Sequence, residues 1–249
     1  MKQNTGIFST FRGDMGLYIA TLLSLTEDPQ AVFRETLIVY DLLKAERFRA
    51  SDFLIVAAFQ VASQSQKSDY ARVIQRTRAF YDDMKAKQFF YTGADDYIFA
   101  TMLGLGNLDV TASTARIEKI YDFLKNEFWT KNSVQTLAQV LVLGESDDAG
   151  VDRVLLFIDK FRSEKIKLDK AYTLPILGIL ALLPVDSNSL IPEIDRAQAF
   201  LRNQKDFGSF SVSQQELLML AASMVVNDFA DKFKDDMTRA ALSTSISLL

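Results

Sequence analysis

The sequence contains no cysteine and no histidine among its 249 residues. Without cysteine the chain forms no disulfide and offers no thiolate nucleophile or zinc ligand, and without histidine it lacks the side chain best suited to transfer protons near neutral pH. A Ser-His-Asp triad cannot be built from this chain alone. We therefore expect no bound metal and no cofactor, and the sequence assigns no residue a catalytic role.

Glycine and proline are also scarce, with 10 and 4 residues, while hydrophobic residues make up 49% of the chain. Few turn-forming residues imply short connections between elements. Strand-like alternation never outcompetes the helical period of about 3.6 residues. The composition and the periodicity together predict an all-α fold.

Clustered basic residues are missing too. The net charge is −4, and acidic and basic side chains are interspersed along the chain. Nucleic-acid binding depends on neutralising phosphates with grouped lysine and arginine. Nucleic acid is therefore not an expected partner.

Long apolar runs are absent as well. The longest nearly uninterrupted run, Tyr172 to Val185, has fourteen residues, short of the roughly 20 that span a bilayer. Met15 to Leu25 is apolar enough to imitate part of a secretion signal, but Asp14 precedes it and Thr26-Glu27-Asp28-Pro29 follows where a cleavage site would lie. We expect a cytoplasmic protein that does not bind membranes.

A repeat of about 40 residues organises what the sequence does contain. Five related strings mark it: Val39-Tyr40-Asp41-Leu42-Leu43-Lys44, Phe80-Tyr81-Asp82-Asp83-Met84-Lys85, Ile120-Tyr121-Asp122-Phe123-Leu124-Lys125, Phe157-Ile158-Asp159-Lys160-Phe161-Arg162 and, more weakly, Phe200-Leu201-Arg202-Asn203-Gln204-Lys205. Positions 41, 82, 122, 159 and 202 are separated by 41, 40, 37 and 43 residues. In the last four strings an arginine lies six positions earlier, at Arg76, Arg116, Arg153 and Arg196.

Each repeat contains two helices of different character. The first is apolar on one side only, which is typical of a surface helix, and an apolar residue closes it, at Phe48, Phe89, Phe128, Ile166 or Phe207. The second is apolar almost all round, as in Tyr97 to Leu105, Val134 to Leu143 and Leu217 to Val226. Such a helix needs neighbours on every side, so we expect it in the interior.

Helix-start signals recur with the same period. Asp28 is expected to cap a helix with Pro29 in its first turn, and Asn132 to Gln135 and Ser213 to Glu216 resemble capping boxes. Ser51, Ser68 and Asp169 lie at similar openings. These residues are expected to set the breaks between helices.

The predicted architecture is a single all-α domain, an α-solenoid of about five stacked helical hairpins, because one such hairpin cannot bury its apolar helix alone. An N-terminal arm at 1–14 precedes hairpins at 15–50, 51–93, 94–131, 132–168 and 169–212, and capping helices follow at 213–249. Met15 to Leu25 carries no charge, and Met237 to Leu248 has an apolar side. We therefore expect the two ends of the stack to mediate association, either with another copy of the chain or with further parts of the same polypeptide.

Several strings are similar, as a set, to a known family: Phe11-Arg12-Gly13 before Gly16-Leu17-Tyr18, Leu25-Thr26-Glu27-Asp28-Pro29, the recurring Tyr-Asp helices, Asp95-Asp96-Tyr97, and Phe207-Gly208 before an apolar helix. They resemble an uncharacterised, mostly Firmicutes family described as a domain of unknown function. The resemblance spans most of the chain and implies an all-helical bacterial protein. It also implies a shortened member, with extra helical sequence at both ends in related chains, and it implies no activity.

Acidic residues provide two candidate sites. Asp41, Asp82, Asp122 and Asp159 could form a carboxylate ridge that binds a hard cation, but Asp122 lies among charged neighbours away from the apolar stripe, so we favour solvated positions. Asp95-Asp96-Tyr97 could supply an acid, a base or a metal ligand. A capping role at the start of a helix is the interpretation that we favour for this pair of acids.

Arginines provide two more. Phe11-Arg12-Gly13-Asp14 could present Arg12 to an anion, although a turn at Gly13 with Asp14 as a cap explains the string better. Arg76, Arg116, Arg153 and Arg196 could line a groove that binds acidic peptides. We favour a packing role for them, in which they cover neighbouring helices and pair with acids.

Two functions follow from these observations. The first is a non-catalytic interaction or scaffold module that binds a protein or peptide, as solenoid surfaces commonly do. The alternative is an enzyme with a carboxylate-lined pocket inside a closed α/α ring. Phe207-Gly208-Ser209-Phe210 faintly resembles the repeats of terpenoid cyclases and prenyltransferase subunits, which have such rings, but their acidic clusters are missing in this chain. The binding residues stay unassigned.

Overall fold

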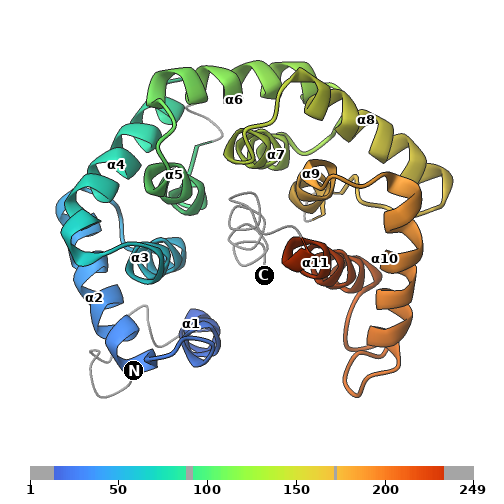
Figure 1. Ribbon diagram of the computed structural model, residues 1–249, viewed down its shortest axis with the longest axis horizontal. Coiled ribbons are helices and arrows are strands. Elements are labelled where there is room, and N and C mark those ends of the chain that lie inside the picture. Colours follow the sequence, from blue (N-terminus) through green and yellow to red (C-terminus); the bar gives the residue numbers. More distant parts are fainter. Residues whose placement is uncertain (1–13, 88–91, 171–172, 233–249) are drawn as a thin grey trace. The chain divides into compact units, whose positions relative to one another are not determined.

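The computed structural model describes residues 14–87, 92–170 and 173–232, and this part of the chain is all-helical, with no strand (Figure 1). The helices are α1 (Asp14–Ser24), α2 (Pro29–Ala45), α3 (Asp52–Gln64), the short 3-10 helix η2 (Lys67–Asp69), α4 (Tyr70–Lys87), α5 (Asp96–Leu105), α6 (Val110–Leu124), α7 (Lys131–Leu143), α8 (Asp148–Ser163), α9 (Leu174–Leu182), α10 (Ser187–Arg202) and α11 (Gln214–Lys232). The predicted fold class, all-α, is confirmed. Within the described ranges, every helix is too short or too polar to cross a membrane.

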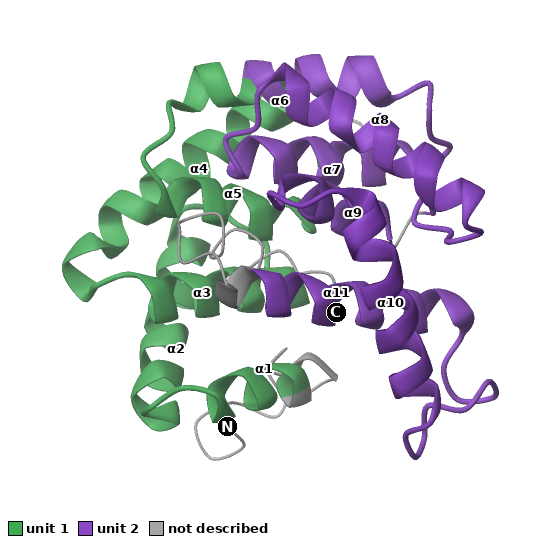
Figure 2. Cartoon of the chain, turned by 45° about the vertical axis from the view of Figure 1, so that its right-hand side comes forward, with its two compact units in different colours: residues 1–114 green, residues 115–249 purple. Residues whose placement is uncertain are grey.

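The chain divides into two compact units, residues 1–114 and 115–249, with the boundary inside α6 (Figure 2). In the first unit α2 and α4 form one layer, and α1, α3 and α5 form a second layer beside it (Figure 1). In this second layer α3 contacts α2, α1 and α5, and α4 packs along α5. The unit is therefore built from helix pairs that share an inner row.

The second unit repeats this arrangement. Its inner row is α7, α9 and α11, with α9 in contact with both of the others, and α8 and α10 pack on the outside of that row. The predicted hairpin 132–168 holds α7 and α8, and 169–212 holds α9 and α10. That all hairpins stack into one solenoid domain stays a prediction.

Burial separates the two kinds of helix as the periodicity predicted. Every residue of α5 from Asp96 to Gly104 is buried, and so is every residue of α9 from Leu174 to Ala181. On α2 and α8 the buried residues recur every three or four positions, on one face. The interior position predicted for 217–226 is only partly right, because α11 uses one side against α9 and α10 and leaves Met224 exposed.

Three of the predicted caps are confirmed. Asp28 accepts hydrogen bonds from the backbone N–H groups of Gln30 and Ala31, with Pro29 next to it. Ser51 caps α3 through the N–H of Leu54. Ser213 and Glu216 exchange hydrogen bonds in a reciprocal capping box at the start of α11.

Three other predicted caps are wrong. α7 already begins at Lys131, so Asn132 to Gln135 lies inside the helix. Thr130, the residue before α7, makes no side-chain cap hydrogen bond. Ser68 lies within η2. Asp169 pairs instead with Arg162, at 3.1 Å, and α9 begins after Thr173. In each case the helix begins at a different residue from the one that the local signal indicates.

Two of the outer helices, α2 and α8, end in the same way. After α2 the N–H of Phe48 bonds the carbonyl of Leu43, and after α8 the N–H of Ile166 bonds the carbonyl of Phe161. The residues before them, Arg47 and Lys165, have φ of 66° and 62°. This is the backbone path of a Schellman motif, with a buried apolar residue just beyond it. Phe48, Phe128 and Ile166 are buried as closing residues, and Phe89 lies outside the described residues.

The two ends of the chain are described only in part. α1 buries Ile19, Leu22 and Leu23, while Leu25, just after it, is 80% exposed. The segment Met237 to Leu248 and the arm 1–13 lie outside the described residues. Association through the ends stays a prediction.

Candidate functional site

The recurring arginines show where the repeat is regular and where it departs from its pattern. On α4, Arg76 donates through Nε to the carbonyl of Gly104, at 3.2 Å, and through Nη2 to that of Leu108, at 2.6 Å. On α8, Arg153 donates through Nη2 to the carbonyls of Leu183 and Val185. Each guanidinium thus binds free carbonyl groups at the end of the following inner helix, where cations are favoured.

Arg116 on α6 does not follow this rule. At the end of α7 the N–H groups of Gly144, Glu145 and Ser146 already bond the carbonyls of Val140, Val142 and Leu141. These last carbonyls need no outside donor. Arg116 instead forms an ion pair through Nη1 with Asp148, the first residue of α8.

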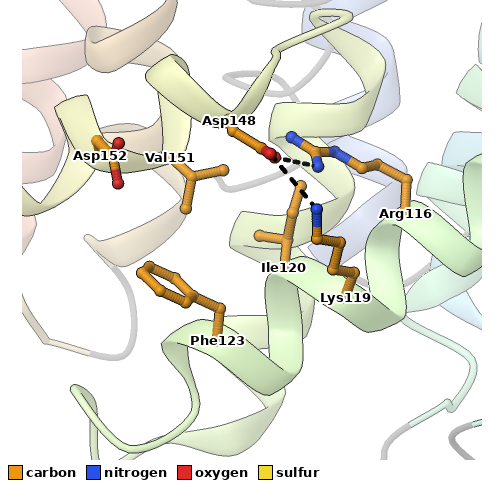
Figure 3. Close-up of a pocket in the computed structure, with 7 residues that line it drawn as sticks. All are labelled: Arg116, Lys119, Ile120, Phe123, Asp148, Val151 and Asp152. Carbon is orange, nitrogen blue, oxygen red and sulfur yellow. Dashed lines mark hydrogen bonds and ion pairs between the residues drawn. The ribbon is translucent and has the colours of Figure 1, made fainter.

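This ion pair places α6 beside α8 within the second unit, with matching residues about 32 positions apart. Together the two helices line a surface groove of about 400 Å³ (Figure 3). Arg116, Lys119, Ile120 and Phe123 come from α6, and Asp148, Val151 and Asp152 come from α8. The groove has an apolar floor and charged groups along its sides.

The two ends of the groove differ in charge. At one end Arg116 and Lys119 share the carboxylate of Asp148, with Lys119 Nζ 3.4 Å from Oδ2. The hydrogen bond from Arg116, and then that from Lys119, holds the pKa of Asp148 below its usual value. Arg116 and Lys119 carry two positive charges against the single negative charge of Asp148, so the net charge of the three groups is positive. Arg116 Nη2 is buried and has no hydrogen-bond acceptor among the described residues. This end is cationic.

The other end carries a carboxylate and exposed apolar groups. Asp152 is exposed and forms no ion pair with any described residue. Phe123 lies across from it in Figure 3, and 55% of its surface is exposed. One turn further along α8, Leu156 is 69% exposed.

These exposed apolar residues occupy related places in the repeat. Phe123 directly follows Asp122, as Leu42 follows Asp41, and Leu156 lies three residues before Asp159, as Ile38 lies three before Asp41. All four are exposed to a large extent. Positions three residues before and one after the marked aspartate lie a single helical turn apart, on the same face. At one or both of these positions, α2, α6 and α8 therefore carry an exposed apolar edge.

The structure does not bring the predicted acids together. Asp41, Asp82, Asp122 and Asp159 are each exposed on their outer helices. Asp82 pairs with Arg78 of the same helix, and Asp122 pairs with Lys125, just after α6. In the described ranges there is no group of three or more acidic residues placed to hold a metal ion. The solvated positions that we favoured for these aspartates are confirmed.

The Asp95-Asp96-Tyr97 string lies at the start of α5, but the favoured capping role is wrong for Asp95, whose side chain makes no cap hydrogen bond. The carboxylate of Asp96, itself buried, accepts a hydrogen bond from the N–H of Gly93 at 2.7 Å. Tyr97 stacks edge-on with Phe48 and Tyr81, with ring centres 4.9 and 5.0 Å away. Burial raises the pKa of both tyrosine hydroxyls. The cluster ties α4 and α5 to the end of α2.

The remaining candidates are separate from the groove. Phe11 to Gly13 lies outside the described residues, and Asp14 is the first residue of α1. Arg196 pairs with Glu193 on its own helix, at 3.2 Å. Phe207 to Phe210 is a loop after α10, whose carbonyl at Phe207 accepts a hydrogen bond from Arg202. Of the predicted arginines, only Arg116 belongs to the groove.

Sequence reasoning missed Phe123, Asp148 and Asp152. Phe123 was visible as a phenylalanine on the polar side of a surface helix, directly after a marked aspartate. Asp148 and Asp152 carried no signal of their own, because their role depends on the neighbouring helix. The spacing of 32 residues between Arg116 and Asp148 could be recognised only with both helices in place.

Comparisons with known proteins give one positive result. No curated protein and no solved structure matches the chain. A family model described as "Protein of unknown function (DUF4003)" matches residues 1–249. The resemblance to a family of unknown function is thereby confirmed, and the chain belongs to this family.

Proposed function

We propose that this protein is a non-catalytic protein-interaction module, an α-solenoid of about five stacked hairpins that binds a segment of a partner protein in the groove between α6 and α8. Phe123 carries the proposal. Its ring is large, more than half exposed, and placed beside a formed groove with an apolar floor. Large exposed apolar groups rimmed by charge are typical of protein-binding surfaces.

The geometry of the groove supports a peptide or helix as its occupant. Neighbouring outer helices leave a channel between them whose floor is made by Ile120 and Val151, both buried. A volume of about 400 Å³ accommodates one or two large side chains of a bound segment. The apolar edge continues past the groove to Leu156, so a bound segment would meet more than one turn of α8.

The cytoplasmic location expected from the sequence belongs to the same proposal. It is supported by the charged residues on both sides of Met15 to Leu25, which are unlike the flanks of a secretion signal. A peptide-binding module in that compartment would act on other cytoplasmic proteins.

The test uses two exposed phenylalanines as a matched pair. Phe123 lines the groove, whereas Phe200 is 56% exposed on α10 and does not. The chain with Phe123→Ser and the chain with Phe200→Ser are each compared with the parent in quantitative affinity capture from a bacterial host. A captured protein is then purified, and its affinity for all three chains is measured.

We expect Phe123→Ser to weaken the binding of the purified partner about tenfold or more, as hot-spot residues do. Phe200→Ser should leave that affinity within about twofold of the parent. Thermal melting of each chain shows that both variants fold. Equal affinities for all three chains would show that the groove is not the binding surface.

A further inference from the structure

We infer that the partner segment carries an acidic side chain about one helical turn from a large apolar one, a deduction that rests on the proposed function. The carboxylate would lie at the Arg116 and Lys119 end of the groove, and the apolar group against Phe123. The inference comes from the charges and the shape of the groove.

The cationic end is short of negative charge. Arg116 and Lys119 have only Asp148 between them, so one positive charge remains over. Lys119 is 68% exposed and is held loosely, at 3.4 Å from the carboxylate, so its ammonium group can turn to a second acceptor. Arg116 contributes its second charge from a partly buried position, with Nη2 buried and without a hydrogen-bond acceptor among the described residues.

Among the described residues, no acid other than Asp148 forms an ion pair with Arg116 or Lys119. Asp152 lies one turn further along α8 than Asp148, on the far side of Val151 in Figure 3. Asp122 is paired with Lys125 instead, at 2.7 Å. A carboxylate from a partner would complete a site with two cations and two acids, where charge-assisted hydrogen bonds are favourable.

The apolar half of the groove sets the spacing. Arg116 and Ile120 are one turn apart on α6, as are Lys119 and Phe123. One helical turn advances about 5.4 Å along the axis. A partner side chain that fits against Phe123, Ile120 and Val151 is therefore about one turn from the group that reaches Lys119. In a partner helix this corresponds to residues three or four apart.

Asp152 gives the site its selectivity. Its exposed carboxylate lies at the apolar end, where a second acid on the ligand would meet repulsion. A segment with acids on both sides of its apolar residue should therefore bind less well than one with a single acid. The preferred ligand combines one acid and one large apolar group.

The probe is a displayed library of random peptides of about twelve residues, selected against the parent chain. Enriched peptides are synthesised, and their affinities are measured by fluorescence anisotropy at about 50 and about 300 mM salt. The same peptides are measured with Phe123→Ser, Lys119→Glu and Asp152→Asn. Lys167→Glu, a charge reversal at an exposed lysine that does not line the groove, is the matched control.

We expect enriched peptides to pair Asp or Glu with a large apolar residue three or four positions away. Lys119→Glu should weaken them about tenfold, Asp152→Asn should tighten them about twofold, and Lys167→Glu should change their affinity by less than about twofold. Higher salt should lower the affinity of the peptides for the parent chain. It should have little effect on their residual affinity for the Lys119→Glu chain.

The outcomes separate the two proposals. Peptides that lose affinity with Phe123→Ser but contain no acid, or that are indifferent to Lys119→Glu, would refute the acidic ligand and leave the groove as a binding site. Peptides that bind equally well to Phe123→Ser, or a selection that enriches none, would refute the proposed function together with this inference.

Discussion

At the scale of single residues, four non-glycine residues in the described part of the chain adopt a backbone conformation that side chains disfavour. Arg47, Glu145, Lys165 and Asp206 have φ between 50° and 68° shortly after the outer helices or α7. A side chain in this left-handed region costs roughly 1 kcal/mol, which glycine avoids. After Arg47 and Lys165, the hydrogen bonds of the closing turn and the buried residues Phe48 and Ile166 offset that cost.

Replacing Lys165 with glycine should therefore stabilise the protein. We expect the free energy of unfolding to rise by about 0.5–1 kcal/mol, because the left-handed conformation becomes unstrained while the exposed lysine loses no described contact. Urea denaturation measures the difference. Lys165→Ala keeps the strain and should give no such gain; if alanine stabilised as much as glycine, the backbone would not be the cause.

A second residue-scale prediction concerns acid. The carboxylate of Asp83 accepts hydrogen bonds from Lys87 and Thr114, which hold its pKa below the usual 3.8. Since the pKa is lowered in the folded state, the contribution of Asp83 to stability is present above pH 3.8 and is lost as the pH falls through the folded pKa.

Asp83→Asn should therefore lower the melting temperature at about pH 7 and have little effect at about pH 2.5. Melting curves of both chains across this range provide the measurement. Asp41→Asn, at an exposed aspartate of an outer helix, is the control and should leave the melting temperature unchanged at both pH values. A difference between parent and Asp83→Asn that persisted unchanged in acid would rule out the ion pair as its source.

At the scale of helices, the arginine contacts fasten one hairpin to the next. The side chain of Arg153 leaves α8, passes over the ring of Phe157 with its guanidinium 4.9 Å from the ring centre, and reaches the carbonyls beyond α9. Arg76 does the same across the ring of Phe80. An arginine in this place covers apolar surface and satisfies carbonyls at once.

Arg153→Met should consequently destabilise the protein. Methionine replaces the apolar part of the arginine side chain, but the carbonyls of Leu183 and Val185 lose their hydrogen-bond donor. We expect a loss of about 1.5–3 kcal/mol in urea denaturation. The equivalent change in the last repeat, Arg196→Met, removes an exposed intrahelical ion pair and should cost less than about 0.5 kcal/mol. Similar losses at both positions would contradict the different roles of these two arginines.

Prediction from sequence succeeded where the cause is local. The helical period separates buried α5 from one-sided α2, and Asp28 and Ser51 act as caps through hydrogen bonds to the next three residues. The groove was not predictable in this way. The last carbonyls of α7 are already hydrogen-bonded within the chain's own turn, so Arg116 does not bind them. It pairs instead with Asp148 on another helix, which the local sequence does not indicate. The turns at Arg47 and Lys165 gave no signal either, because neither residue favours positive φ.

At the scale of the whole molecule, the predicted association through the chain's ends can be tested at Leu25. This side chain is 80% exposed after a helix without charged residues beyond Asp14. If the chain associates there, Leu25→Lys should lower the average mass in light scattering across a dilution series, because a buried charge opposes the contact. Trp129→Ser, at an aromatic residue that is also fully exposed but lies mid-chain, should leave the mass unchanged. A parent that is monomeric at every concentration would contradict the prediction.

In the contacts of Arg76 and Arg153, the donor is synthesised before its acceptors. Arg76 binds carbonyls 28 and 32 residues later, and Arg153 binds carbonyls 30 and 32 residues later. At about 5–20 residues per second, the acceptors of each arginine are synthesised roughly 1.5–6 seconds after the arginine itself. Until those carbonyls are synthesised, water hydrates the guanidinium group, so each of these contacts can form only after the next inner helix has been made.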